Sequence, residues 1–234
     1  MASKAEAATM VGLELVLLVD VSGSVDANEY ALQKGGYVQA FQSAAVQNAI
    51  MNSQLGSIAV TYVEWSGAAQ QAQLVNWTLV NDAASANAFA AAIAGTSRAF
   101  SGLTAIGSAI NYGAGLLAAD NGFDSLRKVM DVSGDGTSND GASVTAARDA
   151  AVAAGITING LTIGTASLLA YYQNNVIGGP GAFAIGVSDF ADFAAAVEKK
   201  LIQEITGVPE PTTLALLGFG LAALGMAARR RKAA

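Results

Sequence analysis

Hydrophobic residues in this chain form short uninterrupted runs that alternate with longer stretches of helical periodicity. One apolar run ends at Asp20, and a second, beginning at Val129, leads to Asp135. Runs bounded by Gly and Ser are typical of strands buried on both faces of a parallel sheet. Further strands are expected at 56–65, 74–80, 156–163 and 183–187. Residues 74–80 follow the preceding strand after a connection of hairpin length, which predicts an antiparallel edge strand.

Helix formers and capping residues fill the segments between these strands. Asp26 with Glu29 three residues later forms a capping box, a pattern typical of a helix start. The helices are expected at 26–50, 82–94, 105–119, 140–154 and from 188 to about 206. Strands alternating with helices predict an α/β fold: a doubly wound, mostly parallel sheet with one antiparallel edge strand and helices on both faces. Residues 13–206 are expected to form one domain of ordinary size.

Charge and composition narrow the classes of function. Before Pro209 the chain carries eight Lys or Arg and seventeen Asp or Glu, a net charge near −9. No basic cluster occurs in that part, so a nucleic acid partner is not expected. The chain has no His and no Cys. It therefore lacks the commonest general base, a thiolate nucleophile and the ligands of a zinc-thiolate site.

Three polar segments carry the candidate chemistry. Asp20, Ser22 and Ser24 follow the first apolar strand at alternate positions, where an open α/β sheet binds its ligands. Thr104 lies in a Gly-containing loop before a helical stretch, and Asp135 follows another strand between two glycines. Carboxylate and hydroxyl oxygens suit a hard cation such as Mg²⁺ or Mn²⁺. Alone, the Asp-x-Ser-x-Ser triplet also fits an ordinary turn.

Taken in chain order, these five residues resemble the metal-ion-dependent adhesion site of the von Willebrand factor A domain. The sequence around Asp20 resembles that of a bacterial subfamily of this domain whose function is uncharacterised. The resemblance implies that Asp20, Ser22, Ser24 and Thr104 bind a cation, Mg²⁺ or alternatively Mn²⁺ or Ca²⁺, and that Asp135 does so through water. It further implies a protein partner whose exposed Asp or Glu completes the coordination, and an adhesion-type module that is not an enzyme.

Two alternative functions stay open at this point. The run 134–140 resembles the Gly-Asp-Gly loop of haloacid-dehalogenase-type phosphatases with one residue too many, but Ser22 occupies the position of their general acid. The chain could instead be a structural biofilm-matrix protein with a vestigial metal site.

Within the run 134–140, Asn139 is expected to be a loop amide and Asp140 a helix N-cap. Asp131 is expected either to orient a ligand hydroxyl or to be a hydrogen-bonded structural carboxylate.

The C-terminal segment 207–234 carries a different signal. Pro209, Glu210 and Pro211 precede the apolar stretch 212–228, which is followed by a basic cluster at Arg229, Arg230 and Arg231. Seventeen apolar or small residues reach about 25 Å as a helix, the lower limit for a bilayer core. The basic cluster places the tail in the cytoplasm and the preceding body on the outer side.

This order of three features resembles the PEP-CTERM sorting signal of Gram-negative bacteria, which the membrane enzyme exosortase recognises and removes. The resemblance implies an exported protein, at the cell surface or extracellular, that is transiently anchored through a hydrophobic helix at 212–228. Residues 1–12 contain no apolar core of an export signal. We expect them to be a remnant of one, unless the true start lies upstream.

Overall fold

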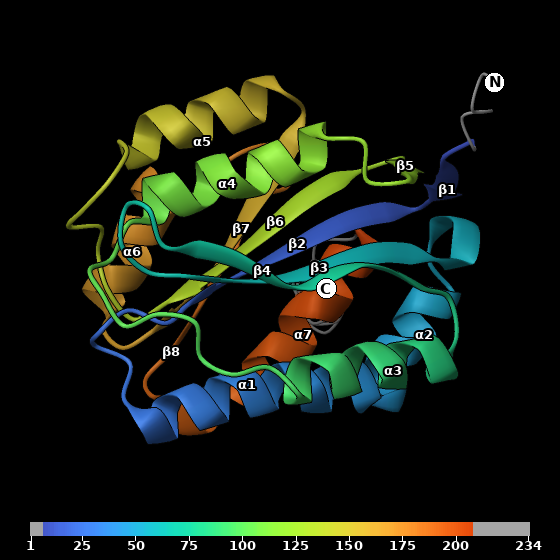
Figure 1. Cartoon of the computed structure of the whole chain (residues 1–234), viewed down its shortest axis with the longest axis horizontal. Coiled ribbons are helices and arrows are strands. Elements are labelled where there is room, and N and C mark those ends of the chain that lie inside the picture. Colours follow the sequence, from blue (N-terminus) through green and yellow to red (C-terminus); the bar gives the residue numbers. More distant parts are fainter. Residues whose placement is uncertain (1–6, 208–234) are drawn as a thin grey trace, which may run out of the picture.

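The structure is a computed structural model that describes residues 7–207. Its centre is a six-stranded sheet of order β4-β3-β2-β6-β7-β8, in which β4 alone pairs antiparallel (Figure 1). The strands are β2 (Leu13–Asp20), β3 (Ile58–Trp65), β4 (Gln71–Val80), β6 (Lys128–Gly134), β7 (Ile156–Ile163) and β8 (Ala184–Val187). Two further strands, β1 (Thr9–Val11) and β5 (Phe123–Ser125), pair in a separate two-stranded sheet. The predicted fold class is confirmed.

Helices cover both faces of the sheet (Figure 1). One layer contains α1 (Ala27–Gln42), α2 (Ala44–Met51), α3 (Ala83–Ala94) and α7 (Phe193–Thr206), and the other contains α4 (Ile106–Ala118), α5 (Val144–Ala153) and α6 (Ala166–Asn175). Two 3₁₀ turns, η1 (Gln54–Gly56) and η2 (Phe190–Asp192), precede β3 and α7. The expected C-terminal hydrophobic helix lies outside the described residues.

Strand β2 explains how the two layers share one sheet. All of its side chains are buried. Leu15 and Leu17 pack into the core on the α1 and α7 side, whereas Val16 and Leu18 pack into the core on the α4 and α5 side. Successive side chains of a strand point to opposite faces, so an uninterrupted apolar run supplies both cores at once. The same run delivers Asp20 to the carboxyl edge of the sheet.

Four segments differ from the expected helices, among them α5, which starts at Val144 and not at residue 140. The single helix expected at 26–50 breaks at Ser43, whose backbone is extended and whose hydroxyl accepts a hydrogen bond from Val46 N at 3.2 Å. The last helix does not start at the Ser188–Asp189 cap, because Asp189 instead accepts from Ala191 N in the 3₁₀ turn η2. Helix α6 was not expected at all. Ser43 and Asp189 each cap a short local element and so set the first two boundaries, and Thr165 caps α6.

Candidate metal centre

Three polar loops, which we call the crests, carry the five candidate ligands: the first spans residues 20–24, the second contains Thr104 and the third contains Asp135. The first crest begins where β2 ends, at Asp20. The Asp20 carboxyl is completely buried, and its Oδ1 accepts a hydrogen bond from Ser22 N at 2.7 Å. Its Oδ2 is also buried and has no hydrogen-bond partner among residues 7–207. Burial raises the pKa of Asp20 from 3.8 to about 7, against the lowering effect of the Ser22 hydrogen bonds. An unpaired buried carboxylate oxygen costs free energy unless a cation or donor meets it.

The two serines of this crest lead to the third crest. The hydroxyls of Ser22 and Ser24 are 3.1 Å apart, and the Ser24 hydroxyl donates to Asp135 Oδ1 at 2.7 Å. Asp135 lies just beyond β6, whose register beside β2 brings the two loops together. Partial burial raises the pKa of Asp135, and the hydrogen bond from Ser24 lowers it in part.

Thr104 occupies the second crest and is tied to the third. Its backbone N donates to Asn139 Oδ1, and its carbonyl accepts from Asn139 N, both at 2.9 Å. A β-carbon built on Gly136 would lie 3.8 Å from Thr104 Oγ1, so this hydroxyl lies beside the Asp135 loop. The first and second crests meet through Gly23 N, which donates to the Gly102 carbonyl at 2.8 Å. All three crests are therefore in pairwise contact.

Arg98 holds the first crest in place and was missed by sequence reasoning. Its Nη2 donates to the carbonyls of Val21 and Ser22 at 2.9 and 2.8 Å. Its Nε donates to the Phe100 carbonyl at 2.9 Å, which links the crest to the segment before Thr104. A lone Arg outside any recognisable pattern gave no signal for this role.

Tyr172 lies beneath the site and was also missed, because α6 was not predicted. A β-carbon on Gly134 would lie 2.6 Å from the Tyr172 hydroxyl and 2.9 Å from Asp20 Oδ2, so Gly is needed where these groups approach. The Tyr172 hydroxyl is buried without a hydrogen-bond partner. Burial, followed by the nearby Asp20 charge, raises the pKa of Tyr172 well above 10. Tyr172 is therefore neutral beneath the Asp20 carboxyl.

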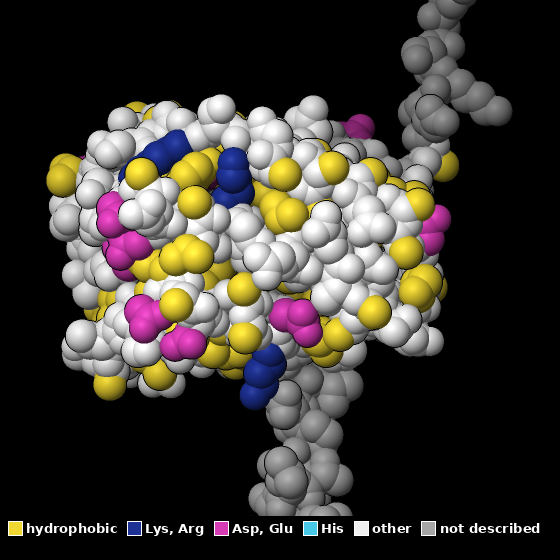
Figure 2. Space-filling view, turned by 90° about the horizontal axis from the view of Figure 1, so that it is seen from below, with side chains coloured by type: hydrophobic (Ala, Val, Ile, Leu, Met, Phe, Trp, Pro, Cys, Tyr) yellow, Lys and Arg dark blue, Asp and Glu magenta, His cyan; other side chains and the backbone are white. Residues whose placement is uncertain are grey.

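The surroundings of the crests are acidic. Figure 2 shows acidic side chains gathered toward the left end of the molecule, the end at which β2 ends in Figure 1. Three exposed carboxylates lie just before two helices: Asp26 before α1, and Asp189 and Asp192 before α7. An acidic ligand approaching this end meets like charge unless a cation lies between.

The donor set fits a hard divalent cation. It combines the Asp20 and Asp135 carboxylates with three hydroxyls, which are the oxygen ligands such ions prefer. Within residues 7–207 there is no group of three or more His, Cys, Asp or Glu side chains that could hold a metal ion. Any cation held by these crests would therefore depend on the serine and threonine hydroxyls as well as on the carboxylates.

Other expectations for this region are resolved by the contacts. Asp26 accepts from Asn28 N and Glu29 N, which confirms the capping box. Asn139 is a loop amide, as expected. The Asp140 prediction was wrong: α5 starts at Val144 with Ser143 as its cap, and Asp140 Oδ2 accepts from Ala68 N at 2.8 Å. Gly141 has a φ of 75°, so the backbone turns there, between Asp140 and the start of α5.

Asp131 lies within β6, four residues before Asp135, but its contacts are separate from the crests. It is completely buried and forms an ion pair with Lys200 Nζ at 2.6 Å. Lys200 also contacts Glu204 Oε1 at 2.5 Å, and Glu204 Oε1 accepts from Asn159 Nδ2 at 2.9 Å. Asp131 therefore has a structural role as the ion-pair partner of Lys200, and neither of its oxygens accepts a hydrogen bond from a hydroxyl within residues 7–207.

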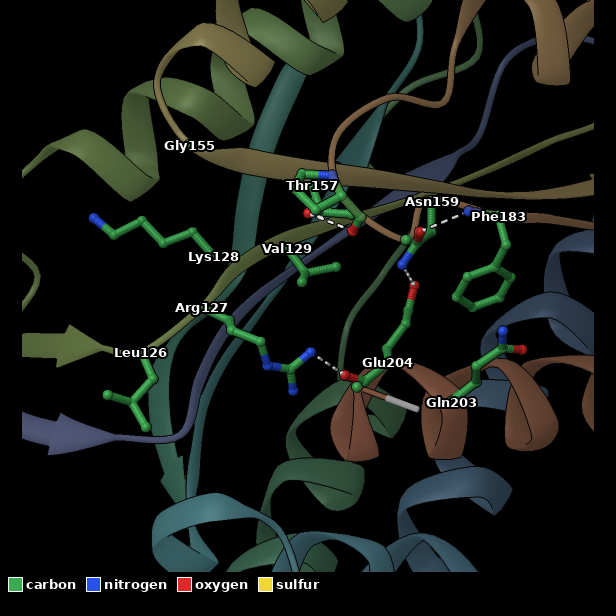
Figure 3. A pocket seen from close by; sticks show the side chains of 13 residues that line it. Leu126, Arg127, Lys128, Val129, Gly155, Thr157, Asn159, Phe183, Gln203 and Glu204 are labelled. Atoms are coloured by element: carbon green, nitrogen blue, oxygen red, sulfur yellow. Dashed lines mark hydrogen bonds between the residues drawn. The ribbon is translucent and has the colours of Figure 1, made fainter. Parts of the chain in front are cut away.

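A cavity of about 460 Å³ lies near this buried network, at the opposite end of the sheet from the crests (Figure 3). Leu126, Arg127, Asn159, Phe183 and Glu204 are among the residues lining it. None of the five candidate metal ligands lines this cavity. The cavity and the crests are therefore separate features.

Comparison with protein families matches residues 10–209 to the family described as protein of unknown function (DUF1194). The chain belongs to the DUF1194 family. Residues 207–232 of this DUF1194 protein match the PEP-CTERM protein-sorting motif. The sorting residues Pro209, Glu210, Pro211 and Arg229 to Arg231 lie outside the described part of the chain. A comparison with curated proteins finds no match.

The fold of the DUF1194 body is similar to that of several solved structures, including a von Willebrand factor type A protein. Proximal thread matrix protein 1 from the mussel byssus matches with a TM-score of 0.65 and 17% identity, covering 86% of this chain and 48% of that protein. The von Willebrand factor type A protein from Catenulispora acidiphila matches with a TM-score of 0.59 and 15% identity, over 83% and 43%. The pilus adhesin SpaC from Lactobacillus rhamnosus GG, in an open conformation, matches with a TM-score of 0.60 and 15% identity, over 85% and 31%.

At such low identities the structural similarity shows the fold alone. The chain spans about half the length of the mussel protein and a smaller share of the other two. The DUF1194 protein thus has a von Willebrand factor A-like fold and carries a PEP-CTERM motif, as predicted. Among residues 7–207, no helix is long and apolar enough to cross a membrane.

Proposed function

We propose that this protein is an exported interaction module that binds an acidic group of a protein partner through a divalent cation. The observation that carries the proposal is the meeting of three crests around Asp20, whose buried Oδ2 has no partner. Side chains from distant parts of the sequence supply oxygen atoms at one place, and one of those atoms is left unpaired. Such an arrangement is costly in the absence of a cation.

In this proposal, Asp20, Ser22, Ser24 and Thr104 hold the ion directly, and Asp135 holds it through water. When bound, the cation supplies an open coordination position for a carboxylate. Mg²⁺ fits the hard oxygen set, with Mn²⁺ or Ca²⁺ as alternatives. A related mussel structure is described as having a zinc-occupied MIDAS motif. That protein shares 15% identity with this chain, and its metal supports a divalent ion here without deciding which one.

The partner is inferred from charge and exposure around the crests. Asp26, Asp189 and Asp192 would repel an acidic partner, so binding should require the cation. Leu103, directly before Thr104, is 57% exposed. Exposed apolar side chains beside a polar site often anchor a partner. We propose that the partner presents an Asp or Glu next to an apolar side chain that contacts Leu103.

The tail supports a cell-surface location. A PEP-CTERM motif is the address of exported, surface-associated proteins of Gram-negative bacteria. We propose that residues 13–206 are the working domain, that exosortase processes segment 207–234, and that 212–228 anchors the chain in the membrane before processing. Gly207, the last described residue, follows α7 beside Arg127, at the opposite end of the sheet from the crests. The metal site would then face away from the membrane.

We propose a binding function and no catalysis. The phosphatase alternative needs a carboxylic acid two residues after Asp20, and a serine, Ser22, stands there with its hydroxyl beside Ser24. A serine hydroxyl is a poor general acid for a leaving group. The named structural neighbours that carry a functional description are a thread matrix protein and a pilus adhesin.

Calorimetric titration with MgCl₂ tests the metal step. The wild-type protein should bind one ion, and Asp20→Ala should lose the binding heat while keeping its circular dichroism spectrum. Asp124→Ala, an exposed Asp at the other end of the sheet, is the matched control and should bind as the wild type does. No heat and no thermal stabilisation of the wild-type protein with Mg²⁺, Mn²⁺ or Ca²⁺ would instead favour a vestigial site in a matrix protein.

A pull-down from the surface fraction of the producing cells tests the partner step. Capture should require the divalent cation and should disappear with EDTA and with Asp20→Ala. Leu103→Ser should weaken capture while leaving the Mg²⁺ titration unchanged. Full capture in excess EDTA would contradict the mechanism.

A further inference from the structure

Most of the large exposed hydrophobic side chains gather at one end of the molecule. Six such side chains occur in the described residues, and four of them precede strands or lie at the amino-terminal edge of the sheet. We call these four the basal patch: Met10, Met51, Leu55 and Leu126, which are between 42% and 55% exposed. The other two, Leu32 and Leu103, lie on α1 and at the metal crests.

Backbone contacts hold the basal patch together. Leu126 N donates to the Val11 carbonyl at 3.2 Å, directly beside Met10. Gly12 N donates to the Ser57 carbonyl at 3.0 Å, which brings the η1 turn with Leu55 against the start of β2. Since β2, β3 and β6 are parallel, the segments before them share one edge of the sheet. This edge is opposite the metal crests.

The C-terminal tail leaves the domain beside the same patch. Arg127, next to Leu126, donates to the carbonyls of Glu204 and Ile205 at 2.9 and 2.8 Å, and so closes the last turn of α7. Figure 3 shows Leu126 and Arg127 on one side of the cavity and Glu204 across from them. Gly207 lines this cavity too, and its φ of 66° ends the helix there.

The distance from this exit to the apolar stretch is short. Residues 208–211 separate Gly207 from the start of 212–228, and the five Cα-to-Cα steps from 207 to 212 reach at most about 18 Å when fully extended. With 212–228 in a bilayer, the basal patch is therefore held close to the lipid headgroups. A tether of this length gives an effective concentration in the millimolar range, so a patch too weak to bind lipid by itself can still dock.

We propose that the basal patch is a membrane-docking surface that rests on the outer face of the phospholipid bilayer before the tail is removed. The proposal rests on the membrane location proposed above for 212–228. Charges beside the patch are mixed, with Arg127 and Lys128 near Asp120 and Asp124, so neither a strongly acidic nor a strongly basic partner is favoured. Exposed Met and Leu side chains are suited to the interface of zwitterionic lipids. Docking would fix the metal crests outward, toward other cells or the matrix.

The absence of Cys makes a direct test possible. Single-cysteine variants Leu55→Cys and Leu126→Cys report the patch, and Leu32→Cys and Leu103→Cys report the rest of the surface. Each full-length variant is labelled with a polarity-sensitive fluorophore and reconstituted into phosphatidylcholine vesicles that contain a lipid-borne quencher. The patch labels should be quenched several-fold more than the control labels, and high salt should not remove the difference. Equal quenching at all four positions would overturn the proposal.

A second variant separates docking from tethering. Leu55→Glu combined with Leu126→Glu changes two exposed side chains, and quenching of a label at Met10→Cys should fall to the control level while the protein still floats with the vesicles. Leu32→Glu is the matched control and should leave the Met10 label quenched. If the full-length chain does not float with vesicles at all, the membrane location and the docking proposal both fail. The Mg²⁺ titration measures the metal proposal independently of either result.

Discussion

The Ser24 hydroxyl donates a 2.7 Å hydrogen bond to Asp135, a carboxylate 111 residues further along the chain. Both residues are more exposed than the fully buried Asp20 beside them. The contact therefore joins two loops at the surface, and its geometry depends on the parallel pairing of β2 with β6 behind it. It also preorganises two oxygens of the proposed metal site, which lowers the cost of ordering them when an ion binds.

Removing this hydrogen bond should lower the affinity for the metal more than it changes the free energy of unfolding. In EDTA, Ser24→Ala and Asp135→Asn should each change the free energy of unfolding by about 1 kcal/mol or less, because the hydrogen bond is exposed. In the Mg²⁺ titration, each should lower affinity at least about tenfold, or about 1.4 kcal/mol. Urea unfolding and calorimetry measure the two quantities. Unchanged affinity in both variants would remove Ser24 and Asp135 from the metal site.

Asp20→Asn should make the metal-free protein more stable. The wild-type carboxyl is buried with an unpaired Oδ2, whereas Asn keeps the acceptor for Ser22 N and presents a neutral amide toward Tyr172. Above neutral pH in EDTA, we expect a gain of about 1 to 3 kcal/mol. In saturating MgCl₂ the order should reverse, because only the wild type gains free energy by binding the ion. A variant that is less stable under both conditions would contradict this account.

Arg98 should position the first crest and not bind the ion. Arg98→Gln removes a cation near the site, which alone would raise metal affinity, but it also removes the Arg98 hydrogen bonds to the carbonyls of Val21 and Ser22, of which the Ser22 carbonyl still accepts from Val25 N. We expect the second effect to dominate, with about 1 to 3 kcal/mol lost in unfolding free energy and a weaker Mg²⁺ titration. Arg98→Lys keeps the charge but not the forked geometry of the guanidinium. It should therefore recover only part of the lost unfolding free energy and Mg²⁺ affinity. Tighter Mg²⁺ binding by Arg98→Gln would show that charge, and not position, decides.

Much of this architecture could be predicted from local pattern. The run before Asp20 is apolar on both faces and so could only be a central strand. The capping box at Asp26 fixed the start of α1. Only the resemblance to the von Willebrand factor A domain implied the place of Thr104, which lies in the loop before α4. The meeting of the first and third crests followed from the rule that parallel strands end at one edge of a sheet. These features are set by residues close in sequence or by strand direction.

The remaining features depend on contacts distant in sequence. Arg98 reaches carbonyls 76 and 77 positions earlier, and no periodicity marks such a residue. Helix α6, which carries Tyr172, contains two Tyr and two Asn in its last five residues, residue types of modest helix propensity, and is capped by Thr165. Lys200 is completely buried, although lysine is almost never fully buried unless it is paired. Its place in the core is decided by two carboxylates, one on another element.

The buried network around Lys200 should give the protein a pH-dependent stability. Asp131 from β6 and Glu204 from α7 share the Lys200 ammonium, with Asn159 from β7 bonded to Glu204 and with Tyr37 and Arg127 nearby. Two carboxylates face one cation. Burial, followed by the Asp131 charge, raises the pKa of Glu204 from 4.5 to about 7, and Lys200 lowers it in part.

The sign of the effect follows from this shift. Because the folded-state pKa of Glu204 lies above the unfolded value, the folded protein binds the extra proton between pH of about 4.5 and 7. The stability that this proton contributes is fully present below that window and is lost as the pH rises through it, with a slope of at most about 1.4 kcal/mol per pH unit. Glu204→Gln should therefore be more stable than the wild type at pH values above the window, and the difference between the two should shrink as the pH falls.

Urea unfolding of both proteins across the window measures that difference, which isolates Glu204 from Asp20 and the other carboxyls that titrate in both. Lys200→Met provides the opposite control. It leaves Asp131 and Glu204 without their cation, so it should lower the free energy of unfolding by about 3 to 5 kcal/mol above the window. That loss should become smaller at low pH, where both carboxyls are protonated. A difference between wild type and Glu204→Gln that does not change with pH would mean that Glu204 keeps one protonation state throughout the window.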